Sequence, residues 1–290
     1  MKRFGAGALI AMASVVLAAG CGSSEGSKGQ VVATTSILAE ITQRVAGPGV
    51  EVSQLIPDGA SPHDFQLSAK ERALLEGADL VIANGGGLEA GLSLDQLSGE
   101  PYELIDHAGP LIRSGPSGQP DPHVWMDPGR VARALPSIAE ALIEVAPDGA
   151  TGFRARAAGY ADELESLGGR MTEILSVVPR RDRELVTSHD SLAYFAQRFE
   201  FAVVATPFPA SGPEAEVTAA SIDEVESTIE ETGVPAVFPE ADSNTAILRG
   251  IAERTGVRLV LGLRVESPGR GGYSTMLIDD ARLIARGLTP

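Results

Sequence analysis

The sequence predicts an α/β protein of two lobes, each with a parallel sheet flanked by helices, joined by one long helix. Short apolar stretches alternate with longer amphipathic ones, which is typical of parallel α/β sheets. The predicted strands fall into two sets, and the segment between the sets contains two helices and no strand. A single larger sheet with a two-helix insertion is the alternative.

The first lobe is predicted at residues 31–149 and the second at 180–290, with the linking helix at 150–179. In the first lobe, strands are expected at 31–36, 51–56, 80–83 and 102–105. In the second lobe, they are expected at 185–187, 202–205, 236–238 and 258–261. Ligands of such sheets bind in a crevice at the carboxyl ends of the strands.

The two helices between the sets are expected at 127–146 and 150–178. Apolar residues of the second recur at three- and four-residue steps and form one stripe. They are Phe153, Tyr160, Leu164, Leu167, Met171, Ile174 and Leu175. Pro179 ends this long helix.

The first twenty residues are typical of an export signal. Lys2 and Arg3 precede an uncharged apolar run that ends at Cys21, the only cysteine. Residues 17–21 resemble a bacterial lipobox with Ala18 in place of the usual Leu, and a lipobox implies a lipid on Cys21. An ordinary signal peptide is the alternative. Residues 1–20 are thus the predicted signal, and 21–30 a flexible polar tether.

Composition and net charge bear on the class of protein and on the ligands it can bind. Hydrophobic residues make up 43% of the chain and charged residues 21%, which predicts a packed core. The net charge of −16 argues against nucleic-acid binding, which needs a basic face.

Three of the four histidines share one setting, a loop that leads from a strand end into a helix. They are His63, His123 and His189. Each has an acid within two residues: Asp64, Asp121 and Asp190. Imidazole is a common ligand of Zn²⁺, and a bound ring hands its second proton to a carboxylate or carbonyl. Three such loops predict a metal site assembled in space, whereas His107 is interpreted as an ordinary loop residue.

A fourth ligand is expected from residues 240–244, again at a strand end before a helix. Glu240, Asp242 and Asn244 each offer an oxygen. Asn244 could instead cap the following helix, which is the commoner role of Asn there.

Other motifs are structural. Gly85, Gly86 and Gly87 follow a predicted strand without the G-x-G-x-x-G spacing, and are interpreted as a tight strand-to-helix turn. G-x-x-x-x-G-K-[ST], G-x-S-x-G and H-E-x-x-H do not occur in the sequence, so kinase, serine hydrolase and zincin functions lack their motifs.

Taken together, these motifs resemble the zinc- and manganese-binding substrate-binding lipoproteins of bacterial ABC importers. The resemblance lies in "GASPHDFQLSAKE", "NGGGLEAGL", "DPHVWMDP", "VTSHDSLAYFAQRF" and "VFPEADSNTAILRGIAERTG", which occur in the family's order over nearly all of the chain after the tether.

The resemblance implies two lobes, a rigid linking helix and one metal ion in the cleft between the lobes. His63 and His123 would come from the first lobe and His189 from the second. Members with His at the third position tend towards zinc and those with Glu towards manganese, so zinc is expected, with manganese as the alternative.

Two departures from the family accompany the match. Residues 109–120 lack the His- and acid-rich loop of many zinc members. The family's fourth ligand, usually Asp, aligns with Asn244, a poorer ligand for Zn²⁺, so Asp242, Glu240 or water could complete the shell.

By this resemblance the protein is no enzyme. It captures a divalent metal outside the cytoplasm, held to the membrane by a lipid as a monomer, and delivers the metal to an ABC permease. Of the nearby acids, Asp121, Asp127, Asp64 and Asp190 are expected to orient the rings or cap helices. The alternatives are a zinc hydrolase with Glu240 as base, and a surface adhesin stabilised by its metal.

Overall fold

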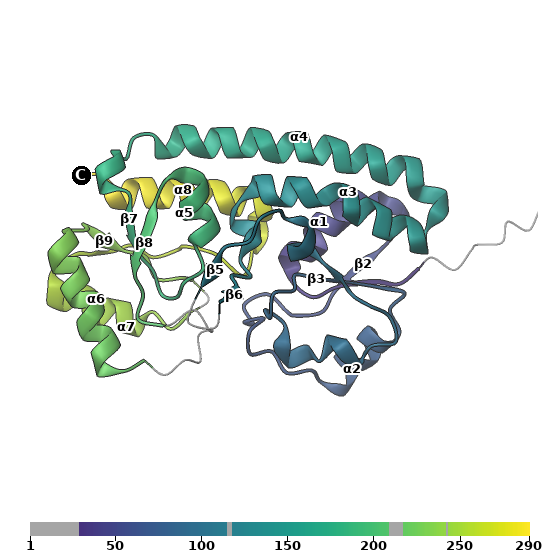
Figure 1. Ribbon diagram of the computed structural model, residues 1–290, viewed down its shortest axis with the longest axis horizontal. Coiled ribbons are helices and arrows are strands. Elements are labelled where there is room, and N and C mark those ends of the chain that lie inside the picture. Colours follow the sequence, from purple (N-terminus) through teal and green to yellow (C-terminus); the bar gives the residue numbers. More distant parts are fainter. Residues whose placement is uncertain (1–28, 115–117, 209–216, 242) are drawn as a thin grey trace, which may run out of the picture.

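The computed structural model describes residues 29–114, 118–208, 217–241 and 243–290. The predicted signal peptide, Cys21 and the tether up to residue 28 lie outside the described residues. Two lobes lie side by side beneath one long helix (Figure 1). None of the helices in the described part of the chain is long and apolar enough to cross a membrane.

Each lobe contains a parallel sheet, and the two sheets repeat one strand order. The first sheet has the order β2-β1-β3-β4. In the second lobe β7 pairs with β8 and β9 with β10, and a bridge between Thr187 and Phe238 joins the two pairs. The eight strands are β1 Val31–Ala33, β2 Val52–Gln54, β3 Leu80–Ala83, β4 Tyr102–Glu103, β7 Glu184–Val186, β8 Ala202–Ala205, β9 Ala236–Val237 and β10 Arg258–Leu259.

The predicted fold class is therefore confirmed. Among the described residues no strand of the first sheet pairs with the second, so the single larger sheet is wrong. Several strands are shorter than predicted. β1 ends before Thr35 because the Thr35 side chain accepts a hydrogen bond from Leu38 N and caps α1 (Ser36–Ala46). A short antiparallel pair, β5 (Arg113–Ser114) and β6 (Gln119–Pro120), was not predicted.

Helices cover both faces of the sheets. One shared layer, formed by α1, α3, α4 and α8, runs over both lobes (Figure 1). Separate helices cover the opposite faces, α2 in the first lobe and α6 and α7 in the second. The bounds are α2 Ala69–Glu76, α3 Pro128–Val145, α4 Ala150–Leu175, α5 Ala193–Phe199, α6 Ala219–Thr232, α7 Ala246–Thr255 and α8 Tyr273–Leu288.

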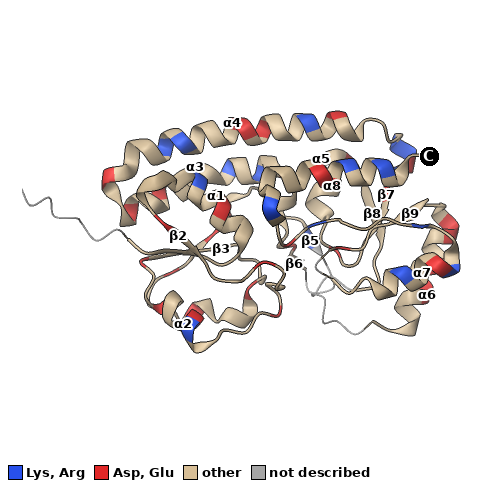
Figure 2. Cartoon of the chain, turned by 180° about the vertical axis from the view of Figure 1, so that it is seen from behind, with Lys and Arg blue, Asp and Glu red and all other residues tan. Residues whose placement is uncertain are grey.

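α4 is the predicted linking helix, and it ends at Leu175, before the predicted end at residue 178. At 26 residues it is about 39 Å long, enough to reach across both lobes. Its outer face carries charges of both signs (Figure 2), and Arg154 forms a two-pronged hydrogen bond to Glu140 of α3. The lobe boundaries drawn from the sequence stay predictions.

The core follows the alternation of the strands. Val31 and Ala33 belong to the large cluster beneath the shared helix layer, whereas Val32 points to the smaller cluster on the α2 side. Leu185 and Val186 divide in the same way in the second lobe. The large cluster includes residues of both lobes, so the lobes share one apolar core.

Candidate metal centre

Three imidazoles and one carboxylate meet where the two lobes face each other. Their ligand atoms, from His63, His123, His189 and Glu266, all lie within 4.8 Å of one another. His189 Nε2 is 3.3 Å from His123 Nε2, and His63 Nε2 is 3.5 Å from Glu266 Oε1. His63 follows β2, His123 precedes a short turn before α3, and the other two follow β7 and β10. Loops beyond strand ends thus assemble the cluster.

His123 is completely buried, and its ring is fixed by Asp121. Asp121 Oδ1 lies 2.8 Å from His123 Nδ1 and also accepts a hydrogen bond from the His123 backbone N–H at 2.9 Å. The carboxylate therefore keeps the ring proton on Nδ1, which leaves the Nε2 lone pair directed at the cluster.

His189 is held in the same way by the second lobe. Its Nδ1 lies 2.8 Å from Glu240 Oε2. The other oxygen of Glu240 accepts a hydrogen bond from Ser191 Oγ at 2.7 Å, and the Glu240 N–H donates to Ser188 Oγ at 3.1 Å. Glu240 is buried together with its partners, so the His189 ring has little freedom to turn.

Two Nε2 lone pairs consequently face each other across 3.3 Å. Such an arrangement is repulsive unless a proton or a metal cation lies between the two nitrogens. Tetrahedral zinc, with Zn–N bonds of about 2.0–2.1 Å, separates its ligand nitrogens by about 3.3 Å. The donor set and its spacing fit a small transition-metal ion.

The electrostatics differ between the imidazoles. Burial, with the nearby His123 and His189, lowers the pKa of His63 to about 3, so this ring is neutral at neutral pH. Burial, the largest single influence, acts to lower the pKa of His189, but the carboxylates of Glu240, Glu266 and Asp121 together outweigh it, and the net shift is upward. His189 therefore binds a proton more tightly than a free imidazole does.

The glycine-rich motif supports the His123 loop from behind. Asn84 Nδ2 donates to the Pro122 carbonyl at 2.8 Å. The Asn84 N–H and Thr34 Oγ1 both donate to the buried Glu89 carboxylate, at 2.8 and 2.7 Å. Burial raises the pKa of Glu89. The turn itself needs glycine, because residues 85–87 all adopt positive φ.

Comparison with known proteins agrees with this geometry. Residues 31–287 match the family described as zinc-uptake complex component A, periplasmic. The chain belongs to this family.

Proteins similar to this chain are named for different metals. The manganese-binding lipoprotein MntA of Halalkalibacterium halodurans is 27% identical over 272 residues, covering 91% of this chain and 90% of that protein. The iron-binding protein YfeA of Yersinia pestis is 30% identical over 251 residues, covering 84% and 80%. The periplasmic zinc-binding protein TroA of Treponema pallidum shares the fold, with a TM-score of 0.84 at 23% identity, covering 91% and 100%. The resemblance read from the sequence motifs is confirmed.

The fourth residue of the cluster is not one of the residues 240–244 from which we expected the fourth ligand. Glu240 contacts His189 Nδ1, on the far side of the ring from the cluster. Asn244 is exposed, and its Oδ1 accepts a hydrogen bond from Ala246 N at the start of α7. Asp242 lies outside the described residues. The structure instead places Glu266 beside the imidazoles.

Sequence reasoning missed Glu266 although a signal was present. "VESPG" at 265–269 is an acid in a loop with Pro and Gly, beyond the last predicted strand of the second lobe. The three histidines lie in the same kind of loop. A search of all strand ends for acids would have included Glu266.

The remaining predicted acids divide by role. Asp127 Oδ1 accepts a hydrogen bond from Gly129 N at 2.9 Å and caps α3. Asp190 is half-buried, and burial, with Asp121 nearby, raises its pKa. Glu240 takes the place beside His189 that we expected for Asp190. Asp64 is half-buried next to His63.

His107 lies in a short helical turn after β4, and its ring stacks on Tyr102 at 4.9 Å. It is not among the grouped ligand residues of the described chain.

Proposed function

We propose that the protein captures a divalent transition metal, zinc by preference, outside the cytoplasm and delivers it to an ABC permease. The observation that carries the proposal is the pair of opposed nitrogens, His123 Nε2 and His189 Nε2, 3.3 Å apart. A carboxylate at each Nδ1 directs both lone pairs inward. His63 and Glu266 complete a set of four ligands.

The choice of zinc follows from the donor set. Three imidazole nitrogens and one carboxylate form an N-rich site that suits Zn²⁺, whereas Mn²⁺ favours more oxygen ligands and a larger coordination number. The names of the relatives span manganese, iron and zinc, so the donors of this chain, rather than its relatives, support zinc.

Capture fits the site better than hydrolysis. Four protein ligands close a tetrahedral shell, while catalytic zinc sites keep one position for water. Glu240, the base that a hydrolase would need, is engaged by His189 and Ser191. Relatives named as lipoproteins support the proposals of a lipid on Cys21 and an extracytoplasmic, membrane-anchored protein, with the permease as partner.

A zinc titration of the soluble chain from Gly22 onward tests the proposal. The parent should bind one zinc ion, and His123→Ala should bind zinc at least about 100-fold more weakly, because it loses a ligand together with its Asp121 support. His107→Ala is the matched control and should bind like the parent. Parent-like zinc binding by His123→Ala would refute the assignment of the site.

A further inference from the structure

Trp125, the only tryptophan of the chain, connects the two loops that supply His123 and Glu266. It lies two residues after His123, is 4% exposed, and packs edge-on against the His123 ring at 5.3 Å between centroids. Its Nε1–H donates to the Val265 carbonyl at 2.8 Å. Val265 directly precedes Glu266, so one indole spans from the first-lobe ligand to the second-lobe ligand.

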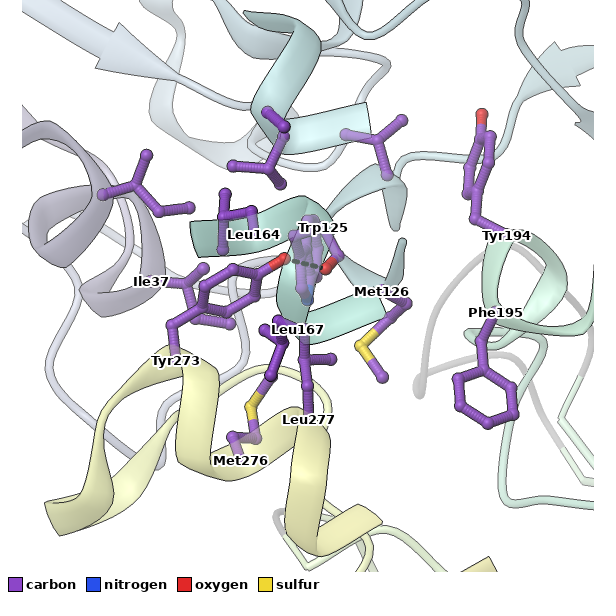
Figure 3. Packing of buried hydrophobic residues seen from close by; sticks show 14 of the residues in the cluster. Ile37, Trp125, Met126, Leu164, Leu167, Tyr194, Phe195, Tyr273, Met276 and Leu277 are labelled. Atoms are coloured by element: carbon purple, nitrogen blue, oxygen red, sulfur yellow. Dashed lines mark hydrogen bonds between the residues drawn. The ribbon is translucent and has the colours of Figure 1, made fainter. Parts of the chain in front are cut away.

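A second hydrogen bond holds the same residue from the opposite side. Tyr273 OH, on the first turn of α8, donates to the Trp125 carbonyl, as the dashed line in Figure 3 shows. Tyr273 is fully buried, and its own N–H donates to Glu40 of α1 at 2.8 Å. Trp125 is therefore fixed at its backbone by α8 and at its ring by the Glu266 loop.

The Glu266 carboxylate faces His63 of the first lobe, but the other described backbone hydrogen bonds of residues 263–266 stay within the second lobe. Ala241 N donates to the Leu263 carbonyl at 2.7 Å, and Arg264 N donates to Asp280 of α8 at 3.0 Å. These bonds set the loop relative to its own sheet and helix. The bond from Trp125 sets it relative to His123, across the lobe boundary.

We infer that Trp125 is a positioning residue that determines metal specificity by fixing the separation of Glu266 from His123. The inference rests on the proposed metal-binding function. Zn²⁺ accepts four ligands at short distances, whereas Mn²⁺ needs longer bonds and additional ligands. Expanding the shell would require the Glu266 loop to move away from His123, and the indole hydrogen bond opposes this movement. Trp125 thus favours zinc over manganese without contacting the ion.

The test compares zinc and manganese affinities of the soluble chain with those of Trp125→Phe, which keeps an aromatic ring and removes the N–H. The zinc-to-manganese affinity ratio should fall by about tenfold, the size of a typical effect from groups that orient metal ligands. The visible absorption of the Co²⁺-loaded variant should also weaken relative to the parent, because a looser shell departs from tetrahedral geometry.

Tyr273→Phe provides a second, milder variant that decides the matter if Trp125→Phe does not fold. It removes the hydrogen bond to the Trp125 carbonyl, and should lower the ratio in the same direction. Tyr160→Phe is the matched control, since the buried Tyr160 hydroxyl on α4 has no hydrogen-bond partner among the described residues. It should leave the ratio and the Co²⁺ spectrum unchanged.

An unchanged ratio and spectrum in both variants, with the parent binding zinc, would overturn the inference. An equal loss of zinc and manganese affinity would overturn it too, because that is the signature of a merely structural residue. Absence of zinc binding by the parent itself would refute the proposed function instead, so the two failures are distinguishable.

Discussion

His123 and His189 present the same donor atom to the centre because a carboxylate holds the far nitrogen of each ring. Asp121 and Glu240 come from different lobes, yet both lie 2.8 Å from the Nδ1 they orient. At the scale of single residues, the candidate site consists of two His–carboxylate pairs, His123 with Asp121 and His189 with Glu240. His63 and Glu266 supply the two other candidate ligands.

Zinc affinity should fall as the pH decreases, because a proton competes with the metal for His189. Its raised pKa means that a proton competes with the metal already above about pH 6.5, the value of a free imidazole. Below that pKa the affinity should drop about tenfold per pH unit for each displaced proton. His63, with a pKa of about 3, should add no competition in this range. Competition titrations between pH 5.5 and 8.5 measure this, and a flat affinity down to about pH 6 would contradict it.

Asp121 and Asp127 flank His123 in the sequence but should respond differently to substitution. Asp121→Asn removes the charge beside His123 Nδ1 and should lower zinc affinity about 10–100-fold. Asp127→Ala removes the cap of α3 and should cost about 1 kcal/mol of unfolding free energy, with zinc affinity kept. Zinc titration and urea unfolding of both variants separate the roles. Equal zinc affinities in the two variants would contradict the assignment.

At the scale of elements, the predictable part of the site is the part that depends on local sequence. His63, His123 and His189 could be predicted because each follows or precedes a recognisable strand or helix, with an acid nearby. Asn244 could be seen as a helix cap for the same reason.

Glu266 also follows a predicted strand, but the sequence does not single it out from the other acids at strand ends, because its place beside the histidines depends on tertiary contacts. Its loop is held by α8 through Asp280 and by the first lobe through Trp125. These contacts join residues far apart in the sequence, and no local pattern specifies them. The role of Glu240 was missed for a similar reason, since its carboxylate is directed by Ser191 from another strand end.

α8 approaches the second sheet so closely that glycine is required at position 287. A Cβ there would lie 2.4 Å from Phe238 Cε1, so Gly287→Ala should destabilise the protein by about 1–3 kcal/mol. Gly159→Ala on α4 is the matched control. Its position is exposed with open space around it, and alanine should stabilise the helix by about 0.5–1 kcal/mol. Urea unfolding measures both, and a neutral Gly287→Ala would contradict the close packing.

At the scale of the whole molecule, the shared apolar core lies apart from the candidate metal ligands, so we expect the fold to depend on that core and not on the metal. The large apolar cluster runs from Val31 to Leu288 and includes α4 and α8, while the ligands lie in loops at its edge. This separation distinguishes a carrier from a protein that needs its metal to fold.

Chelator-stripped protein should therefore keep its helical circular dichroism and unfold cooperatively. Added zinc should stabilise the folded protein through binding alone, and the melting temperature should rise. At a free zinc concentration of 100 times the dissociation constant, the expected stabilisation is about 2.7 kcal/mol. Loss of helical signal on stripping would contradict this and would favour the metal-stabilised adhesin.

The central claim is that one metal ion binds between His63, His123, His189 and Glu266. Anomalous diffraction at the zinc edge, from crystals of the zinc-loaded protein, tests it most directly. The account predicts a single strong peak within about 2.0–2.2 Å of the three Nε2 atoms and a Glu266 oxygen. A peak bound instead by residues 240–244, or one lacking His123 and His189, would contradict it.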